Sequence, residues 1–260
     1  MNFSDKLEKI VKANNSLLCV GLDPNPFDLR GKKNQFEFNR EIIDLTAQDV
    51  CAYKPNIAFY SAAGIKGLES LIKTIHYIKT KYPEIPVLLD AKRGDVGHTS
   101  EMYAKELFDM YGADAATVIP YYGFDSLEPF FKRSGRGVFV ICRTSNPGAK
   151  DFQDLESGAV KVYQRVAEKI AQWSIKYPNV HLEIGATWPG EIGVLRKMIP
   201  EMIFLIAGVG AQGGDIKRTL ENGLRADKKG LIINSSRGII YDKSPAEAAK
   251  RLKDEINKYR

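Results

Sequence analysis

An acid and a base stand close together at the end of an apolar segment. Asp90 and Lys92, separated by one alanine, end a run that begins at residue 86, and Asp95 follows three positions later. Side chains alternate between the two faces of a strand, so Asp90 and Lys92 are expected to point the same way. Buried charges are costly unless they pair, and paired charges cluster at functional sites. The pattern predicts either a catalytic acid–base group or a salt bridge between strand end and loop, with Asp95 capping a turn.

A glycine-rich segment and an arginine suggest a second kind of chemistry. Residues 208–213 match G-x-G-x-x-G and contain Gln212. The match alone would suggest a dinucleotide site, but it follows the seventh apolar run, and the next run ends in Asn234 rather than in an acid. The same glycines suit a mobile loop around a phosphate, or a plain flexible turn. Because a guanidinium binds phosphate bidentately, Arg237 after the eighth run favours the phosphate interpretation.

Other polar residues have ordinary interpretations when each is taken alone. Asp23 and Lys54 each follow an apolar run and could be simple loop charges. Thr99 could cap a helix predicted over residues 101–111, as could the serine that follows it. His98 lies near Asp95 but has no Cys, His or acidic spacing typical of a metal site, so no metal is expected.

Eight short β-rich apolar runs recur along the chain, with helical periodicity between them. The runs cover residues 16–22, 51–59, 86–89, 115–119, 137–142, 181–184, 202–207 and 231–233. Continuous apolar strands that alternate with helices are typical of a parallel sheet covered by helices, and eight repeats favour closure. The sequence therefore predicts an α/β fold, a (β/α)8 TIM barrel formed by one domain over residues 1–260. An open doubly wound sheet is the alternative. In a barrel the working residues follow the strand carboxyl ends, where Asp90, Lys92 and Arg237 stand.

The composition argues against several classes of partner. The net charge is +6, but Lys and Arg are scattered without a basic stripe. We therefore expect no nucleic-acid partner, and a modest positive field would instead favour encounter with a small anion. No apolar run approaches the roughly 18 residues of a membrane span, and the first residues do not resemble a leader. Three widely spaced cysteines suit reduced core thiols, so we expect a cytoplasmic protein without membrane contact.

The segment Asp90-Ala91-Lys92-Arg93-Gly94-Asp95 resembles the Asp-x-Lys-x-x-Asp signature of the orotidine 5'-phosphate decarboxylases. Other segments resemble motifs of this family in the same order, from residue 21 to residue 241. They are Gly21-Leu22-Asp23, Ala52-Tyr53-Lys54, Thr144-Ser145-Asn146-Pro147-Gly148, residues 208–215 and Ser235-Ser236-Arg237. Two departures stand out: Ala207 replaces a proline of many relatives, and residues 237–241 resemble the longer, bacterial-type branch.

The resemblance implies which residues would do the chemistry. Asp90, Lys92, Asp95 and Lys54 would form a charged catalytic network, in which Asp95 holds Lys92 and Lys92 supplies the proton that ends at C6 of the pyrimidine. Asp95 and Thr99 would reach into the active site of a second copy, so the resemblance implies a homodimer.

The resemblance also implies how the substrate would be held. Asp23 would contact the ribose, which Lys54 also touches, and Ser145 would read the pyrimidine. Gln212 and Arg237 would bind the phosphate.

The implied activity is decarboxylation of orotidine 5'-phosphate to uridine 5'-phosphate in de novo pyrimidine biosynthesis, without a metal or cofactor. A rival is a magnesium-dependent sugar-phosphate aldolase or decarboxylase of the hexulose-phosphate synthase group, which shares the signature. The segment around Ser145 favours a pyrimidine over a sugar. A second rival is a barrel that binds a nucleotide phosphate without catalysis. Intact Asp90, Lys92 and Asp95 argue against it, because phosphate binding requires none of them.

Overall fold

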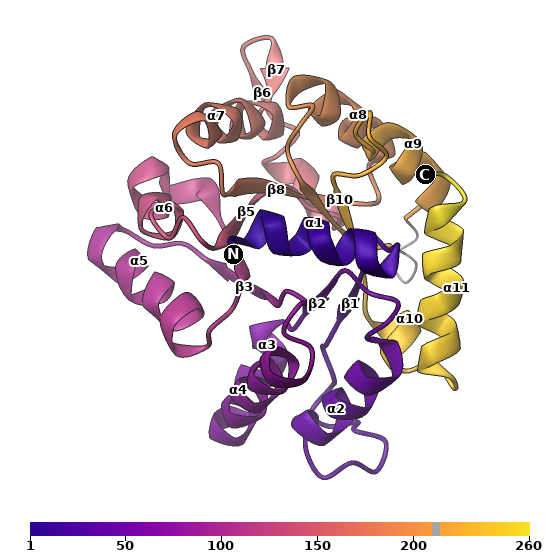
Figure 1. The fold of residues 1–260 in the computed structure, drawn as a ribbon. Helices are drawn as coiled ribbons and strands as arrows, with labels where there is room; N and C mark the ends of the chain where they lie inside the picture. Colours follow the sequence, from indigo (N-terminus) through magenta and orange to yellow (C-terminus); the bar gives the residue numbers. More distant parts are fainter. Residues whose placement is uncertain (210–213) are drawn as a thin grey trace.

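A single parallel sheet of eight strands forms the centre of the molecule. The computed structural model describes residues 1–209 and 214–260, and helices surround the sheet (Figure 1). Its strands are β1 (Leu18–Gly21), β2 (Ala52–Lys54), β3 (Leu88–Arg93), β4 (Ala115–Val118), β5 (Gly137–Arg143), β8 (Val180–Gly185), β9 (Phe204–Ala207) and β10 (Leu231–Ser235). Hydrogen bonding joins them in the order β2-β1-β10-β9-β8-β5-β4-β3.

The first and last strands of this order, β2 and β3, meet and close the sheet. Isolated bridges pair Tyr53 with Val87 and Asn56 with Asp90. The backbone N–H of Asp90 also donates to the carbonyl of Pro55 at 2.9 Å. The predicted (β/α)8 TIM barrel is therefore confirmed, and the alternative of an open doubly wound sheet is wrong.

Helices cover the outside of the barrel. They are α1 (Phe3–Asn14), α2 (Gln35–Thr46), α3 (Ile57–Ser61), α4 (Gly64–Lys81), α5 (Gly97–Ala104) with a π-helical continuation η1 (Lys105–Met110), α6 (Phe124–Phe131), α7 (Val162–Lys176), α8 (Pro189–Met198), α9 (Ile216–Gly223), α10 (Arg237–Ile240) and α11 (Pro245–Asn257). Short 3₁₀ turns η2 (Pro120–Tyr122) and η3 (Pro147–Asp151) and a hairpin of β6 (Glu156–Ser157) and β7 (Val160–Lys161) complete the described elements. Within the described ranges, no helix combines the length and apolar character that a membrane span requires.

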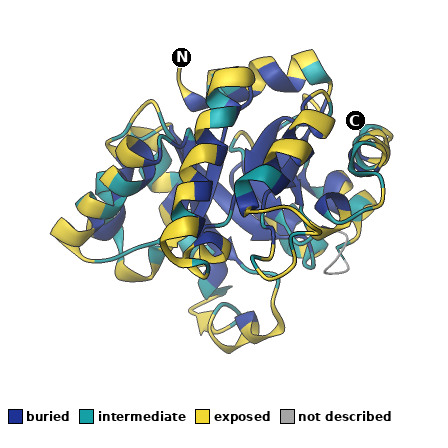
Figure 2. Cartoon of the chain, turned by 90° about the horizontal axis from the view of Figure 1, so that it is seen from below, coloured by how far each residue is buried: buried dark blue, intermediate teal, exposed yellow. Residues whose placement is uncertain are grey.

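Burial follows the expected pattern. Figure 2 shows the strands buried at the centre, while the surrounding helices turn one face inward and one face to solvent. Cys19, Cys51 and Cys142 are buried free thiols, as the sequence predicts.

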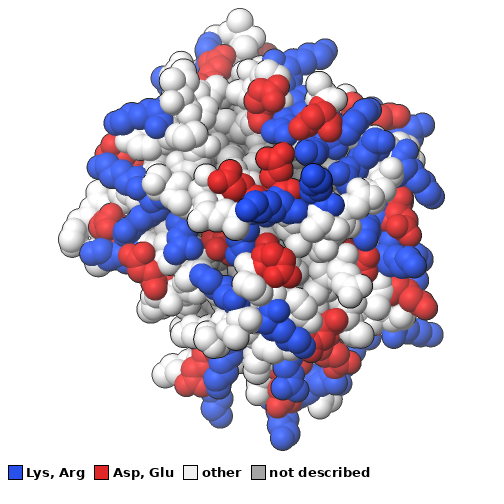
Figure 3. All heavy atoms as spheres, viewed as in Figure 1, with Lys and Arg blue, Asp and Glu red and all other residues white. Residues whose placement is uncertain are grey.

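Helix α1 lies across the amino-terminal end of the barrel (Figure 1). The ring of Phe3 packs 5.7 Å from that of Phe139 and 5.8 Å from that of His181, measured between centroids. A Cβ on Gly137 would come within 2.4 Å of the Phe3 ring, so a glycine is required there. On this face of the molecule, basic and acidic side chains are interspersed (Figure 3). Because α1 covers the amino-terminal end, a site is expected at the opposite end, where the strands have their carboxyl ends.

Two of the predicted boundaries that differ from the structure bear on the site. The second strand, predicted over residues 51–59, ends at Lys54, because Pro55 cannot donate to a strand ladder and the Asn56 side chain caps α3. The helix predicted over residues 101–111 begins earlier, at Gly97, so Thr99 lies in its first turn rather than at its cap.

Candidate active site

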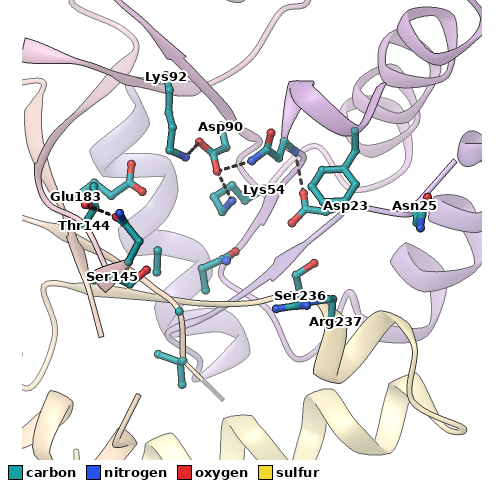
Figure 4. A pocket seen from close by; sticks show the side chains of 18 of the residues that line it. Asp23, Asn25, Lys54, Asp90, Lys92, Thr144, Ser145, Glu183, Ser236 and Arg237 are labelled. Carbon is teal, nitrogen blue, oxygen red and sulfur yellow. Dashed lines mark hydrogen bonds and ion pairs between the residues drawn. The ribbon is translucent and has the colours of Figure 1, made fainter. Parts of the chain in front are cut away.

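A pocket of about 630 Å³ opens at the carboxyl ends of the strands. This volume is within the usual range for small-molecule sites. Figure 4 shows the pocket with charged side chains on one side and Arg237 on the other. Its lining comes from several strand ends and includes Asp23, Lys54, Asp90, Lys92, Thr144, Ser145, Glu183, Asn234, Ser236 and Arg237.

Asp90 is the centre of the charged side of the pocket. Its Oδ2 accepts hydrogen bonds from Lys54 Nζ at 2.8 Å and from Asn56 Nδ2 at 3.1 Å. Its Oδ1 accepts from Lys92 Nζ at 2.5 Å and from the hydroxyl of Thr117 at 3.0 Å. The network forms at the seam that closes the barrel, since Asn56 and Asp90 also pair through their backbones.

Burial and charge act in opposite directions on this network. Burial opposes ionisation of Asp90, but the two lysines outweigh it and hold the pKa of that carboxyl well below its usual range. Burial likewise opposes protonation of Lys54, yet Asp90 and Asp23 raise its pKa above the ordinary value. Asp90 is therefore a carboxylate and Lys54 an ammonium at neutral pH. The side chain of Lys92 is 42% exposed whereas that of Asp90 is 6% exposed, so Lys92 presents its ammonium toward the open pocket.

The backbone of Lys92 is irregular. Its φ is +48°, a left-handed conformation that side-chain-bearing residues rarely adopt, and the pairing of β3 with β4 shifts at this point. The hydroxyl of Thr117 on β4 accepts hydrogen bonds from the backbone N–H groups of Ala91 at 3.1 Å and Lys92 at 3.0 Å. Thr117 thus supports both the irregular backbone and the carboxylate of Asp90.

Asp23 lies at the end of β1, on the other side of Lys54. Its Oδ1 accepts from the backbone N–H of Asn56 at 2.9 Å. Burial raises the pKa of Asp23, while Lys54 acts in the opposite direction. A partly buried carboxylate beside an ammonium is suited to accept hydrogen bonds from hydroxyl groups of a ligand.

The loop after β5 forms the wall opposite the lysines. Trp188 Nε1 donates to the carbonyl of Thr144 at 2.8 Å, and Thr187 Oγ1 donates to that of Ser145 at 3.1 Å. A Cβ on Gly185 would approach the backbone nitrogen of Ser145 to 2.6 Å, so the close approach of loop and β8 requires glycine. The side chain of Ser145 is thereby set at the pocket wall.

Arg237 begins α10, directly after β10, and its exposed side chain lines the far end of the pocket. Gly208 and Val209, at the start of the glycine-rich segment, line the pocket as well. Val209 pairs with Gly214 across that segment. Gln212 lies outside the described residues.

Comparison with known proteins places the chain in a family. Residues 16–252 match the model of the orotidine 5'-phosphate decarboxylase / HUMPS family. The chain belongs to this family. A relative from Dehalococcoides mccartyi named orotidine 5'-phosphate decarboxylase is 47% identical, over 100% of this chain and 99% of its own length. One from Ralstonia pickettii with the same name is 46% identical over 100% of both chains.

Solved structures agree with this family assignment. The Leishmania donovani OMP decarboxylase superposes with a TM-score of 0.91 at 40% identity, covering 100% of this chain and 99% of that one. A putative orotidine-monophosphate-decarboxylase from Toxoplasma gondii superposes with a TM-score of 0.95 at 36% identity, covering 99% and 96%.

Most residues predicted from the family signature meet in one pocket. The lining includes Asp23, Lys54, Asp90, Lys92, Ser145 and Arg237. Asp95 and Thr99 are not part of that lining. Instead Asp95 Oδ1 accepts from the N–H of Val96 at 2.7 Å, and Thr99 is exposed on α5. Within one chain, therefore, the ion pair recorded for Lys92 is with Asp90 and not with Asp95.

Several polar residues of the site were not predicted from the sequence, and Thr117 and Glu183 are two of them. Thr117 gave no signal, because a threonine in an apolar run is typical of any strand. Glu183 gave a signal that could have been used: it is an acid inside an apolar run, on the same strand face as Gly185. Among the described residues, no group of three or more His, Cys, Asp or Glu side chains is placed to hold a metal ion. The metal-free reaction stays a prediction.

Proposed function

We propose that the chain decarboxylates orotidine 5'-phosphate to uridine 5'-phosphate and carbon dioxide, with Lys92 as the proton donor to C6. The observation that carries this proposal is the Lys54–Asp90–Lys92 network, with one ammonium turned to the open pocket. A carboxylate that binds both lysines orients the exposed one toward the space where a substrate would lie.

In the proposed reaction the bond between C6 and the carboxylate carbon breaks, and its electron pair stays on C6. Lys92 stabilises that developing charge as a nearby cation and then transfers a proton from Nζ to C6. The neutral amine regains a proton from solvent. Asp90 lies near the departing carboxylate and orients Lys92. Because the electron pair left on C6 is taken up by the proton from Lys92, no external electron acceptor is required.

Proton transfer is only part of the required acceleration. A general acid contributes on the order of 10²- to 10⁴-fold, whereas demanding enzymatic reactions need about 20 kcal/mol of barrier reduction. The remainder must come from binding energy of groups distant from C6. In this proposal Arg237 and Gln212 bind the phosphate, Asp23 binds the ribose and Ser145 contacts the pyrimidine.

We also propose that the working form is a homodimer in which Asp95 and Thr99 complete the partner's site. Exposed apolar side chains lie on this segment and on the neighbouring turn η2. Val96, between Asp95 and Thr99, is 59% exposed, and Tyr121 of η2 is 87% exposed. The contact between the two segments is direct, since the N–H of Ile119 donates to the carbonyl of Arg93 at 2.8 Å. Exposed apolar groups beside charged site residues are typical of an interface.

The magnesium-dependent sugar-phosphate reaction is less well supported. The relatives that match over the full length are named orotidine 5'-phosphate decarboxylase. The pocket wall formed by Thr144 and Ser145 also offers polar groups opposite the lysines, as a pyrimidine edge requires.

The direct test supplies purified protein with orotidine 5'-phosphate and, separately, with a hexulose phosphate plus magnesium. The proposal predicts loss of the orotate absorbance with formation of uridine 5'-phosphate, and no reaction of the sugar phosphate. Turnover of the sugar phosphate alone would overturn it.

A further inference from the structure

Glu183 is a buried acid that the proposed mechanism does not use. It lies on β8, is 7% exposed and lines the pocket. Its Oε2 has no hydrogen-bond partner among the residues that the structure describes. Figure 4 shows its side chain directed into the pocket, toward the side that carries Lys92 and Lys54. A buried carboxyl oxygen that no described protein group satisfies, and that faces a pocket, is available to a ligand.

The groups that face Glu183 come from across the barrel. Asp90 and Lys92 of β3 and Lys54 of β2 act on it electrostatically. Arg143 of the neighbouring β5 also lines the pocket, but its guanidinium is engaged in an ion pair at 3.1 Å with an aspartate. The other neighbour, β9, and the next strand, β10, carry no titratable side chain, and α7 packs on the outer face.

Glu183 lies beside a cluster whose acids are already matched by bases. Two carboxylates and two ammonium groups compensate one another: Asp23, Lys54, Asp90 and Lys92. An ionised Glu183 would add a third carboxylate to this cluster, close enough to Asp90 for the two to repel each other. Burial, and then the repulsion of Asp90, raises the pKa of Glu183 to about 7, against the weaker opposing effect of the lysines.

We propose that Glu183 is a further substrate-contacting residue, which acts in its neutral form as a hydrogen-bond donor to an oxygen of the orotate group. This inference rests on the proposed function, because it takes orotidine 5'-phosphate as the ligand. A protonated carboxyl offers one O–H donor. The orotate group offers oxygen acceptors, namely two ring carbonyls and a carboxylate. Ionised Glu183 would lose the donor and repel the substrate, which already carries negative charge.

The test is the pH dependence of kcat/KM for the parent and for Glu183→Gln. Glutamine has nearly the same shape, is neutral at every pH and retains a donor. In both proteins kcat/KM increases as the pH is raised toward neutral, because the substrate phosphate, with a second pKa of about 6, becomes a dianion. In the parent alone, kcat/KM then falls by roughly tenfold per pH unit above the pKa of Glu183, because kcat/KM reports groups of the free enzyme.

Two further variants isolate the donor from the charge. Glu183→Leu is neutral but cannot donate, so its profile has the same shape as that of Glu183→Gln, without a decline at high pH, and its kcat/KM is lower by roughly 3- to 10-fold. Glu84→Gln, at an exposed acid in the loop before β3, is the matched control and keeps the parent profile. Inhibition by uridine 5'-phosphate, which lacks the carboxylate, identifies the acceptor: weaker inhibition of the Leu variant indicates a ring carbonyl, and unchanged inhibition indicates the carboxylate.

The two proposals fail in different ways. A parent protein that does not turn over orotidine 5'-phosphate contradicts the proposed function. An active parent whose decline at high pH persists in Glu183→Gln, or a Leu variant equal to the Gln variant at every pH, contradicts the role of Glu183 alone.

Discussion

The hydroxyl of Thr117 on β4 accepts a hydrogen bond from the backbone N–H of Lys92 on the adjacent strand β3, at 3.0 Å. It also accepts from Ala91 and donates to the carboxylate of Asp90. One buried hydroxyl therefore fixes the backbone and the side-chain partner of the proposed proton donor.

Thr117→Val should lower both stability and kcat. The change leaves the N–H groups of Ala91 and Lys92 without this acceptor, at a cost of about 1–3 kcal/mol for the buried N–H of Ala91. Displacement of Lys92 should reduce kcat on the order of 10- to 100-fold. Thermal unfolding and steady-state kinetics measure the two effects.

Two variants control for Thr117→Val. Thr117→Ser keeps the hydroxyl and should retain most of the activity. Thr219→Val removes a buried hydroxyl that has no hydrogen-bond partner among the described residues, so it should be nearly neutral. A Thr117→Val protein with parental kcat would show that the hydroxyl does not position Lys92.

Lys92→Ala should abolish turnover while it preserves binding. Loss of the general acid lowers kcat on the order of 10²- to 10⁴-fold or more. Binding of uridine 5'-phosphate should remain measurable by calorimetry, because the proposed phosphate contact, Arg237, lies at the far end of the pocket. Lys73→Ala, on the exposed surface of α4, is the control. Comparable kcat in Lys92→Ala and parent would refute Lys92 as proton donor.

Arg237→Ala should act through the phosphate. Removal of a charge-assisted contact should lower kcat/KM for orotidine 5'-phosphate on the order of 10²-fold or more. Orotidine, which lacks the phosphate, should react nearly equally with variant and parent. Arg251→Ala, an exposed arginine of α11 paired with Asp242, should leave both substrates unaffected. Equal losses on both substrates would withdraw the phosphate-site assignment.

Mixing two inactive variants tests the shared site. If Asp95 completes the partner's pocket, Lys92→Ala and Asp95→Asn are each inactive, yet a mixed dimer contains one intact pocket. After subunit exchange, random pairing in a two-fold dimer should restore about a quarter of the parental activity. No recovery from a mixture that chromatography shows to be dimeric and exchanged would place Asp95 in its own chain's site.

The sequence predicted the barrel because its strands are uniformly apolar and alternate with helices. It also predicted that the side chains of Asp90 and Lys92 lie close together, but it assumed regular strand geometry for both residues. Strand alternation places both on one face, but Lys92 has left-handed backbone geometry, which a two-residue periodicity does not reveal. The early end of β2 escaped prediction because Asn56 caps the following helix through a side-chain contact.

What the sequence could not predict depends on contacts between distant strands. Thr117 looks like any strand threonine until β4 lies beside β3 and its hydroxyl faces the Lys92 backbone. Glu183 becomes unusual only when the barrel closes, because its Oε2 then has no hydrogen-bond partner within residues 1–209 and 214–260. Asp95 is the opposite case: its motif is recognisable in the sequence, but in the described part of one chain its carboxylate accepts from the neighbouring N–H of Val96.

The central claim is a metal-free decarboxylation in which Lys92, linked through Asp90 to Lys54, is the proton donor. The most direct measurement is the ultraviolet assay of chelator-treated, dialysed protein on orotidine 5'-phosphate. We predict full activity that added magnesium does not change. Activity that disappears with the chelator and returns with magnesium would contradict the claim and move the chain to the sugar-phosphate reaction.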